Sequence, residues 1–192
     1  ANAVSVAEHV MTMFLYLAKN INKSDSLVKS GQFKKQNTLP NFFELYQKKI
    51  LILGFGRIGQ AVAQRCLGFE ADVLVYDPFV DEKTINNKNC TKVEFDAGIK
   101  IADFITVHMP LSNQTKNLIS KKNFLQMKEE AIIVNTARGG IINESDLYWA
   151  LKNKKIHGAG TDVFEVEPPD NNNPLFKLDN ILLSPHNAAL TL

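Results

Sequence analysis

The sequence predicts an α/β domain built on a doubly wound, parallel β-sheet. Short runs of consecutive apolar residues alternate with segments of helical periodicity, which is typical of buried parallel strands joined by helices. One such run, Lys49–Leu53, ends at Gly54 and passes directly into a helical segment. The chain has 192 residues, 45% of them hydrophobic and 22% charged, and is long enough for one domain with a packed core.

An N-terminal helix is expected over residues 5–19, where apolar residues recur at helical spacing. Ser5 and Glu8 have the spacing of a capping box, which would start this helix at Ser5. Residues 20–41 are polar and rich in Lys, Asn, Ser and Gln. We expect a short helix and a loop there, leading into the body of the domain.

The body should follow as alternating strands and helices. The expected strands are Lys49–Leu53, Asp72–Tyr76, Phe104–Val107, 131–135, 156–162 and 181–184. The expected helices are 58–67, 96–101, 121–127 and 144–153, the last with Asn143 as its N-cap. In a doubly wound sheet the first of these strands lies inside the sheet, so we expect Lys49–Leu53 to have a neighbour on each side.

Composition and charge exclude several classes of protein. The net charge of +2 is too small for a strongly basic nucleic-acid binder. The longest apolar stretch, near residues 10–18, is far shorter than the roughly 20 residues of a membrane-spanning helix. Cys66 and Cys90 cannot by themselves form a disulfide scaffold or a zinc site. We therefore expect a reduced, cytoplasmic protein with no metal centre and with neither nucleic acid nor membrane as a partner.

The turn after the first expected strand of the body reads G-F-G-R-I-G, from Gly54 to Gly59. A G-x-G-x-x-G that follows a buried strand and opens a helix is the fingerprint of a dinucleotide-binding, Rossmann-type fold. Gly54 would permit the tight turn, Gly56 would let the backbone approach a pyrophosphate, and Gly59 would let the helix pack closely on the strand. The helix N-terminus would offer its N–H groups to the phosphates. Without a ligand, the same glycines would form only a tight strand-to-helix turn.

A carboxylate is expected at the adenosine ribose of the dinucleotide. Asp77 follows Gly59 by 18 residues and stands at the end of the second strand. It can accept hydrogen bonds from the ribose hydroxyls and would repel a 2′-phosphate, and no Arg occurs among the next three residues. These features favour NAD over NADP as the cofactor. The alternative is that Asp77 is a plain turn residue before Pro78.

Three further polar residues are expected near the carboxyl ends of the later strands. Arg138, one of three Arg in the chain, lies in N-T-A-R-G-G and suits bidentate capture of a carboxylate. His186 directly follows the last strand, and Glu167 precedes a pair of prolines beyond another strand end. Each alone has an ordinary interpretation, Arg138 as a solvated surface residue and His186 as a structural one. Their common place at one edge of the sheet favours a ligand site.

Together the motifs resemble the NAD-binding domain of the D-isomer-specific 2-hydroxyacid dehydrogenases, a family that includes D-3-phosphoglycerate dehydrogenase. The resemblance runs over nearly the whole chain, from N-A-V-S-V-A-E at its start to S-P-H-N-A-A near its end. Between them lie G-F-G-R-I-G, Y-D-P, H-M-P-L, N-T-A-R-G-G and D-V-F-E-V-E-P-P, in this order. Several motifs in one order at family-like spacing make the resemblance highly specific.

The resemblance implies a role for each site residue. The implied cofactor-binding residues are Gly54, Gly56, Arg57, Ile58 and Gly59 at the pyrophosphate, Asp77 at the ribose, Thr136, Ala137 and Arg138 at the nicotinamide half, Asp162 at the nicotinamide ring or its carboxamide, and His186. The implied catalytic trio is Arg138, Glu167 and His186. Glu165 would be an exposed neighbour of the trio, and His108 would have a structural or supporting role.

The implied reaction moves a hydride between C2 of a hydroxy acid and the nicotinamide. His186 would take up the hydroxyl proton in oxidation and return it in reduction, and Glu167 would hold the other ring nitrogen and fix its tautomer. Arg138 would bind the substrate carboxylate and polarise the carbonyl oxygen. A Gln in place of Glu167 would have indicated formate-type chemistry, so a small 2-hydroxy or 2-oxo acid is preferred as the substrate.

Family members also carry a substrate domain, and the motifs of this chain do not include it. We therefore expect residues 1–192 to be the NAD-binding domain alone, with residues 1–45 as an N-terminal helix and connecting arm and residues 46–192 as the Rossmann body. The first helix resembles one that the family uses near the hinge and in dimer contacts, so a homodimer is expected of the full-length protein. The apolar stripe of that helix is equally suited to the core.

Two other functions stay open at this point. A dinucleotide-sensing scaffold of the co-repressor type shares the fold and the trio, but carries a Trp just after the catalytic His. Here Ala188, Ala189 and Leu190 follow His186, and the sole Trp is Trp149 on an expected helix, which disfavours that alternative. The other alternative is an NAD-binding domain without activity. The identity of the acid would depend on the missing substrate domain.

Overall fold

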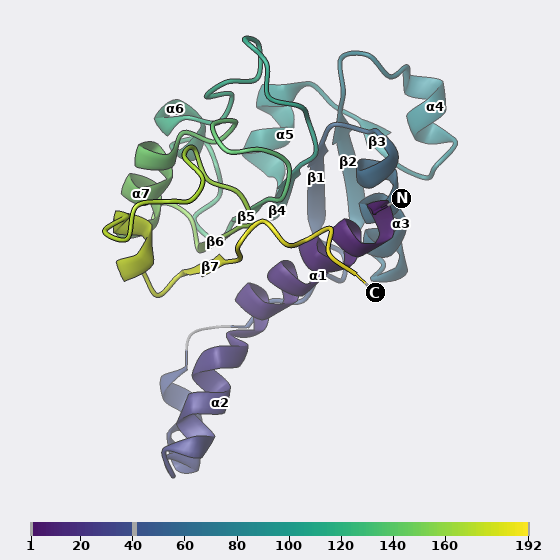
Figure 1. The fold of residues 1–192 in the computed structure, drawn as a ribbon. Helices are drawn as coiled ribbons and strands as arrows, with labels where there is room; N and C mark the ends of the chain where they lie inside the picture. Colours follow the sequence, from purple (N-terminus) through teal and green to yellow (C-terminus); the bar gives the residue numbers. More distant parts are fainter. Residues whose placement is uncertain (1, 40–41, 192) are drawn as a thin grey trace.

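The computed structural model describes residues 2–39 and 42–191, and Figure 1 shows their arrangement. In this part of the chain, seven parallel strands form one sheet in the order β3-β2-β1-β4-β5-β6-β7. The strands are β1 (Lys49–Leu53), β2 (Asp72–Tyr76), β3 (Thr91–Lys92), β4 (Phe104–Val107), β5 (Ile132–Asn135), β6 (Gly158–Thr161) and β7 (Ile181–Leu183). Because β1 pairs with β2 on one side and β4 on the other, the predicted doubly wound, parallel sheet is confirmed.

Besides the strands, the described part of the chain forms α-helices and short 3-10 helices. They are α1 (Ala3–Lys19), α2 (Ile21–Lys29), η1 (Phe33–Thr38), α3 (Arg57–Gly68), α4 (Glu82–Asn86), α5 (Phe95–Ile101), α6 (Lys121–Phe124), α7 (Glu144–Lys152) and η2 (Pro174–Lys177). The strand order reverses between β1 and β4. In open α/β sheets a crevice forms at such a reversal, outside the carboxyl ends of the strands, and this is where ligands bind.

The hydrophobic core consists of two clusters, one on each face of the sheet. Along β1 the fully buried side chains alternate between them, with Ile50 and Ile52 in one cluster and Leu51 and Leu53 in the other. Helices α1 and α3 contribute to the first cluster, and α5, α6 and α7 contribute to the second. A strand that is buried on both faces has no place for polar side chains, which explains the continuous apolar run in its sequence.

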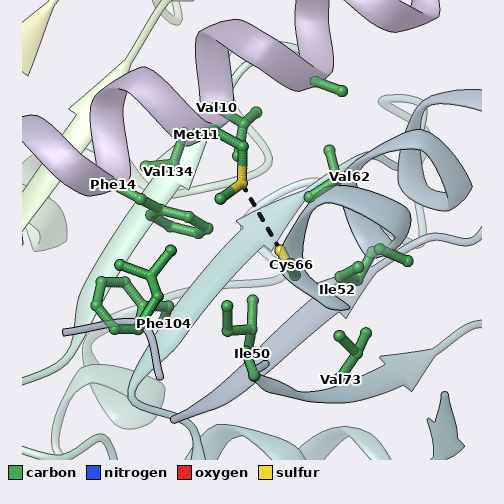
Figure 2. Close-up of a cluster of buried hydrophobic side chains, with 14 of the residues drawn as sticks. Val10, Met11, Phe14, Ile50, Ile52, Val62, Cys66, Val73, Phe104 and Val134 are labelled. Atoms are coloured by element: carbon green, nitrogen blue, oxygen red, sulfur yellow. Dashed lines mark hydrogen bonds between the residues drawn. The ribbon is translucent and has the colours of Figure 1, made fainter. Parts of the chain in front are cut away.

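Helix α1 is part of the first cluster (Figure 2). Phe14 is fully buried and packs edge-on against Phe104 of β4, with the ring centroids 5.1 Å apart. A Cβ at Gly160 of β6 would lie 2.7 Å from the sulfur of Met13, so the glycine allows α1 to approach the sheet closely. The apolar stripe of the N-terminal helix therefore belongs to the core.

The start of α1 differs from the predicted start. The helix begins at Ala3 with Asn2 as its N-cap and without a side-chain cap, so the capping box expected at Ser5 is wrong. The side chain of Asn2 donates instead to the carbonyl of Ala189, at the other end of the chain. A tertiary contact has here replaced the local one that the sequence suggested.

Other boundaries differ by a few residues. The helix predicted at 121–127 ends at Phe124, and the strand predicted at 156–162 is limited to the four residues of β6. The N-cap of α7 is confirmed, because the Asn143 side chain accepts a hydrogen bond from the N–H of Asp146. β3, α4 and η2 have no counterpart among the predicted elements, since each has five residues or fewer and displays no period.

The segment formed by α2 and η1 extends away from the sheet, as Figure 1 shows. No residue of these two helices is buried. Ile21, Val28 and Phe33 each expose more than half of their surface, so the arm presents apolar side chains to its surroundings. Among the described helices, none has the length and apolar character needed to cross a bilayer.

Candidate active site

A groove of about 580 Å³ lies at the carboxyl ends of the central strands. Its walls include Gly56, Arg57, Ile58, His108, Thr136, Arg138, Asp162 and His186, together with the start of α1. Residues from the loops after β1, β4, β5, β6 and β7 are thus brought together, as the parallel sheet predicts. The other predicted site residues do not line this groove: Gly54, Gly59, Asp77, Ala137 and Glu167.

The glycine loop between β1 and α3 forms the wall at the switch between β1 and β4. Gly54 has a φ of +97°, and a Cβ there would lie 2.7 Å from the carbonyl oxygen of His108. A Cβ at Gly59 would collide with the carbonyl oxygen of Gly54, so both residues are required by the turn itself. Around Gly56, by contrast, no described atom other than those of the glycine and its chain neighbours lies within 4 Å of the position of a Cβ. That open space adjoins the groove at the N-terminus of α3, where a ligand phosphate could approach the backbone.

Asp77 anchors the glycine loop. Its Oδ2 accepts a hydrogen bond of 2.7 Å from the N–H of Phe55, and its Oδ1 accepts one of 2.8 Å from the N–H of Phe79. The carboxylate is nearly buried, just after the end of β2. Each oxygen keeps a second acceptor site, so Asp77 can hold the loop and still accept a hydrogen bond from a ribose hydroxyl.

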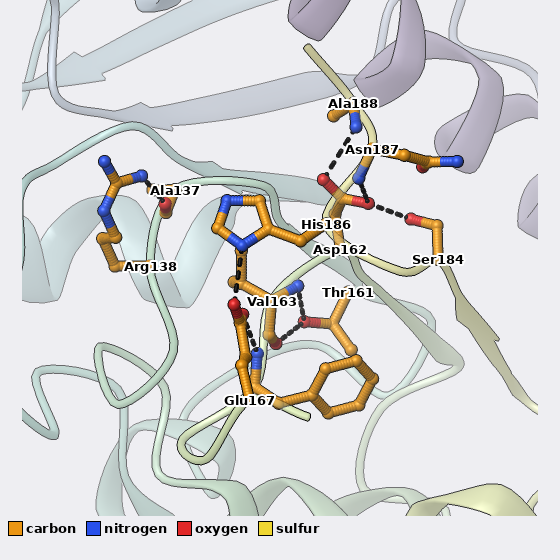
Figure 3. Close-up of polar contacts among 11 residues, drawn as sticks. Ala137, Arg138, Thr161, Asp162, Val163, Glu167, Ser184, His186, Asn187 and Ala188 are labelled. Atoms are coloured by element: carbon orange, nitrogen blue, oxygen red, sulfur yellow. Dashed lines mark hydrogen bonds and ion pairs between the residues drawn. The ribbon is translucent and has the colours of Figure 1, made fainter. Parts of the chain in front are cut away.

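Asp162, which lines the groove, anchors the turn after β7 in the way that Asp77 anchors the glycine loop. Its carboxylate is buried, and it accepts hydrogen bonds from the Ser184 hydroxyl and from the N–H groups of Asn187 and Ala188 (Figure 3). These two N–H groups follow His186, whose φ of +53° lies in the left-handed region that a non-glycine residue rarely adopts. Asp162 therefore fixes the turn that presents His186.

His186 and Glu167 form a close pair (Figure 3). Nδ1 of His186 lies 2.7 Å from Oε2 of Glu167, while Oε1 of Glu167 accepts a hydrogen bond of 3.0 Å from the N–H of Phe164. The hydrogen bond from His186 lowers the pKa of Glu167, and the Phe164 N–H and the charge of Arg138 lower that pKa further. Glu167 is thus held as a carboxylate against one ring nitrogen, and it fixes which nitrogen carries the proton.

Arg138 lies across from His186 in Figure 3, in the turn after β5. Its guanidinium is exposed and donates to the carbonyl of Ala137. The turn is closed by Asn135, whose amide donates to the Arg138 carbonyl at 2.9 Å and accepts from the Ala137 N–H at 3.0 Å. A cation is therefore available next to the His186–Glu167 pair.

Several buried polar atoms around the groove lack a hydrogen-bond partner among the described residues. They include Nδ1 of His108, Oγ1 of Thr136 and Oδ1 of Asn187. His108 and Thr136 both line the groove, so their atoms are placed to serve a bound ligand. Burial also lowers the pKa of His108 to about 3, so its imidazole is neutral at physiological pH. Over residues 2–39 and 42–191, His, Cys, Asp and Glu side chains form no cluster suited to a metal ion.

Three residues of the site were not singled out from the sequence. Asn135 and Ser184 lie inside recognised motifs, and their polar side chains at strand ends were a usable signal. The third is His9 of α1, whose Nε2 lies 2.9 Å from the hydroxyl of Ser184. These two residues are 175 positions apart, and no local pattern reveals their contact.

The chain is similar to known proteins over nearly its whole length. The family model of the D-isomer specific 2-hydroxyacid dehydrogenase, NAD binding domain, matches residues 11–188. A D-3-phosphoglycerate dehydrogenase of Archaeoglobus fulgidus is 42% identical over 99% of this chain and 36% of its own length. A hydroxypyruvate reductase of Thermotoga maritima is 39% identical over all of this chain and 61% of its own length. The crystal structure of a D-lactate dehydrogenase from Aquifex aeolicus, complexed with NAD and lactic acid, superimposes with a TM-score of 0.88 at 32% identity, covering 97% of this chain and 60% of that one.

Proposed function

This chain belongs to the D-isomer specific 2-hydroxyacid dehydrogenases as an NAD-binding domain, and on this premise we propose that the protein carrying it is an NAD-dependent oxidoreductase acting on a D-2-hydroxy acid. The observation that carries the proposal is the 2.7 Å contact between His186 Nδ1 and Glu167 Oε2 beside the groove. It leaves Nε2 of His186 as the nitrogen for proton exchange. A base with a fixed tautomer next to a cation is the arrangement that this reaction needs.

The geometry of the trio supports a catalytic role for each of its members. In the direction of oxidation, Nε2 of His186 accepts the proton of the substrate hydroxyl, and Glu167 stabilises the resulting imidazolium through Nδ1–H. Arg138 binds the substrate carboxylate and, in the direction of reduction, polarises the 2-oxo group. NAD, when bound, supplies the hydride acceptor. The chain's own residues position the substrate and move the proton.

The cofactor is proposed to lie along the groove. The pyrophosphate would lie over Gly56 and the N–H groups of Arg57 and Ile58, where the space around the glycine is open. The nicotinamide half would lie beside Thr136 and Ala137, with the unpartnered hydroxyl of Thr136 as one contact. The oxygens of Asp162 have one acceptor site left for the carboxamide after the hydrogen bonds to Ser184, Asn187 and Ala188.

Asp77 supports NAD over NADP. Its nearly buried carboxylate stands at the end of β2, where the adenosine ribose binds in this fold. A 2′-phosphate at that position would meet a negative charge, and Asp77 cannot turn away because both of its oxygens hold backbone N–H groups.

The substrate is proposed to resemble 3-phosphoglycerate, supported by 42% identity to a D-3-phosphoglycerate dehydrogenase. The chain spans about a third of that relative's length. Residues outside this chain would then form the other side of the substrate site. They would decide between 3-phosphoglycerate and other small 2-hydroxy acids.

We also propose a homodimer and a cytoplasmic location for the full-length protein. The dimer is supported by the apolar side chains of Ile21, Val28 and Phe33 on the arm, since a second copy could cover them. The location is supported by Cys66 and Cys90, which are both buried as free thiols. Analytical ultracentrifugation would test the dimer, and Phe33→Asp should weaken it if the arm is the contact.

The function is tested by assaying the full-length protein with NADH against a panel of 2-oxo acids. We expect oxidation of NADH with at least one of 3-phosphohydroxypyruvate, hydroxypyruvate and glyoxylate. The product of either of the first two acids should have the D configuration. NADPH should be a poorer donor. A protein that binds NADH but reduces none of these acids would contradict the proposed reaction.

A further inference from the structure

We propose that His9 of helix α1 is a positioning residue that holds the turn around His186, through Ser184 and Asp162. This inference rests on the proposed function, because it assigns His9 to the catalytic histidine. It starts from a continuous chain of contacts. Nε2 of His9 lies 2.9 Å from Oγ of Ser184, and that hydroxyl bonds to Oδ1 of Asp162.

The direction of these hydrogen bonds is fixed by counting protons. The Ser184 hydroxyl has one hydrogen, and it donates that hydrogen to the buried carboxylate of Asp162. Towards His9, Ser184 can therefore only accept, so Nε2 of His9 must carry a hydrogen and donate it. His9 Nε2 also lies 3.9 Å from Oδ1 of Asp162, which places a donor dipole beside the buried negative charge.

The next step leads from Asp162 to His186. Oδ1 of Asp162 accepts the Asn187 N–H at 3.0 Å, and Oδ2 accepts the Ala188 N–H at 2.9 Å. These bonds hold a turn in which His186 has a φ of +53°. A non-glycine residue in that region is strained, and it keeps such a conformation only where its surroundings determine it.

Helix α1 makes His9 a rigid support. On the same helix, Phe14 and Val10 are fully buried against the sheet, while the His9 side chain is only 25% exposed and reaches the loop after β7. The core packing of α1 is therefore transmitted to Ser184 through the His9 donor, while Asn2 at the start of the helix donates separately to Ala189. Without that donor, the Ser184 hydroxyl keeps only its hydrogen bond to Asp162, and the link from α1 that orients this hydroxyl is lost.

The predicted effect is a fall in kcat at nearly unchanged KM for the 2-oxo acid, because Arg138, which binds the carboxylate, lies on a different loop. A displacement of the base by about 1 Å lowers the rate by up to roughly 100-fold. We expect His9→Leu to lower kcat by roughly 10- to 100-fold, and His9→Gln, which retains an N–H donor, to recover most of the loss. Thr12→Ala is the matched control, since this exposed residue of α1 bonds only to the Glu8 carbonyl of its own helix.

A double-mutant cycle in the full-length protein tests whether His9 acts through Ser184. The combination of His9→Leu and Ser184→Ala should be no slower than Ser184→Ala alone, because both changes break one chain of contacts. Multiplicative losses, or a His9→Leu variant with wild-type kcat, would overturn the proposal.

A second readout does not depend on turnover. Hydrogen exchange of the Asn187 and Ala188 amides should be faster in His9→Leu than in the wild type, with no change in the amides of β1 and β4. Unchanged exchange at Asn187 and Ala188 would refute the role of His9 even in a protein that reduces no 2-oxo acid. A wild-type protein without turnover would instead contradict the proposed function.

Discussion

The carboxylate of Asp77 accepts a hydrogen bond of 2.7 Å from the N–H of Phe55, which joins the end of β2 to the glycine loop after β1. The residue that we propose selects the cofactor by charge is thus also the one that shapes the loop proposed for its pyrophosphate. A second bond, from the N–H of Phe79, holds the other oxygen. Both contributions are lost together when the side chain is removed.

We therefore predict that Asp77→Ala weakens NAD binding and narrows the preference over NADP. Losing hydrogen bonds to a charged group costs about 1.5–3 kcal/mol, which corresponds to roughly 10- to 100-fold in Kd. Calorimetric titration with each dinucleotide measures both effects. Asp72→Ala is the control, because Asp72 is exposed and only pairs with Lys49 at the far end of β2. An unchanged ratio of NAD to NADP affinity in Asp77→Ala would remove the ribose role.

His186→Ala in the full-length protein should abolish most turnover while NADH binding is largely kept. Loss of a general acid or base lowers the rate by about 10²–10⁴-fold.

Glu167→Gln should shift a limb of the pH–rate profile, because the imidazole loses its charged partner at 2.7 Å. Glu165→Gln serves as the control. Glu165 accepts the N–H of Glu144 at the start of α7 and does not contact the trio. Normal turnover of His186→Ala would contradict the assigned base.

The positions of β1, β2 and β4 could be predicted, since all three strands match their expected bounds. Strands that are buried on both faces leave a continuous apolar signal, and that signal is independent of the rest of the chain. The predicted cluster of Arg138, Asp162 and His186 around one groove likewise follows from parallel strands that end at the same edge. Local sequence was sufficient for these features.

The contacts that shape the site could not be predicted, because they join distant segments. Asp162 was expected at the nicotinamide, but nothing in D-V-F-E indicated that it would hold the N–H groups of Asn187 and Ala188. His9 shows the same limit, since its partner Ser184 lies on the last strand's loop. Such roles depend on side chains that meet only in the folded domain.

Helix α1 should be essential to the stability of the domain. Phe14 is fully buried and contacts Phe104, so Phe14→Ala removes a large side chain from the core and leaves a cavity. Such changes lower the free energy of unfolding by about 3–5 kcal/mol. Val4→Ala, on the exposed side of the same helix, should change it by less than about 0.5 kcal/mol. Urea titration measures both, and equal effects would show that α1 is a loosely attached arm.

His108 should add to the acid sensitivity of the domain. Burial lowers the pKa of His108 in the folded protein to about 3. In the unfolded chain its side chain is exposed and has the ordinary histidine pKa of about 6.5. Between these two values the unfolded state binds more protons, so stability falls as the pH decreases. His108→Gln should remove this contribution to the decrease in the free energy of unfolding between pH 6 and pH 4. Thermal unfolding at several pH values would measure the difference. An imidazole signal of His108 that titrates near pH 6 by NMR would contradict the assignment.

The 192-residue chain alone should bind NADH but should not catalyse its oxidation by a 2-oxo acid. Its sheet and both hydrophobic clusters are formed by residues of this chain, and so are the proposed contacts from the Gly54 loop through Asp77 to Asp162. Affinity should be lower than in the full-length protein, because the groove is open on the side where a substrate domain would exclude water. For the same reason the 2-oxo acid would have Arg138 and His186 on one side and solvent on the other. NADH fluorescence, followed by addition of a 2-oxo acid, tests both halves of this prediction. The absence of any NADH signal at millimolar protein would contradict the cofactor site, and rapid oxidation would show that the whole substrate site lies within this chain.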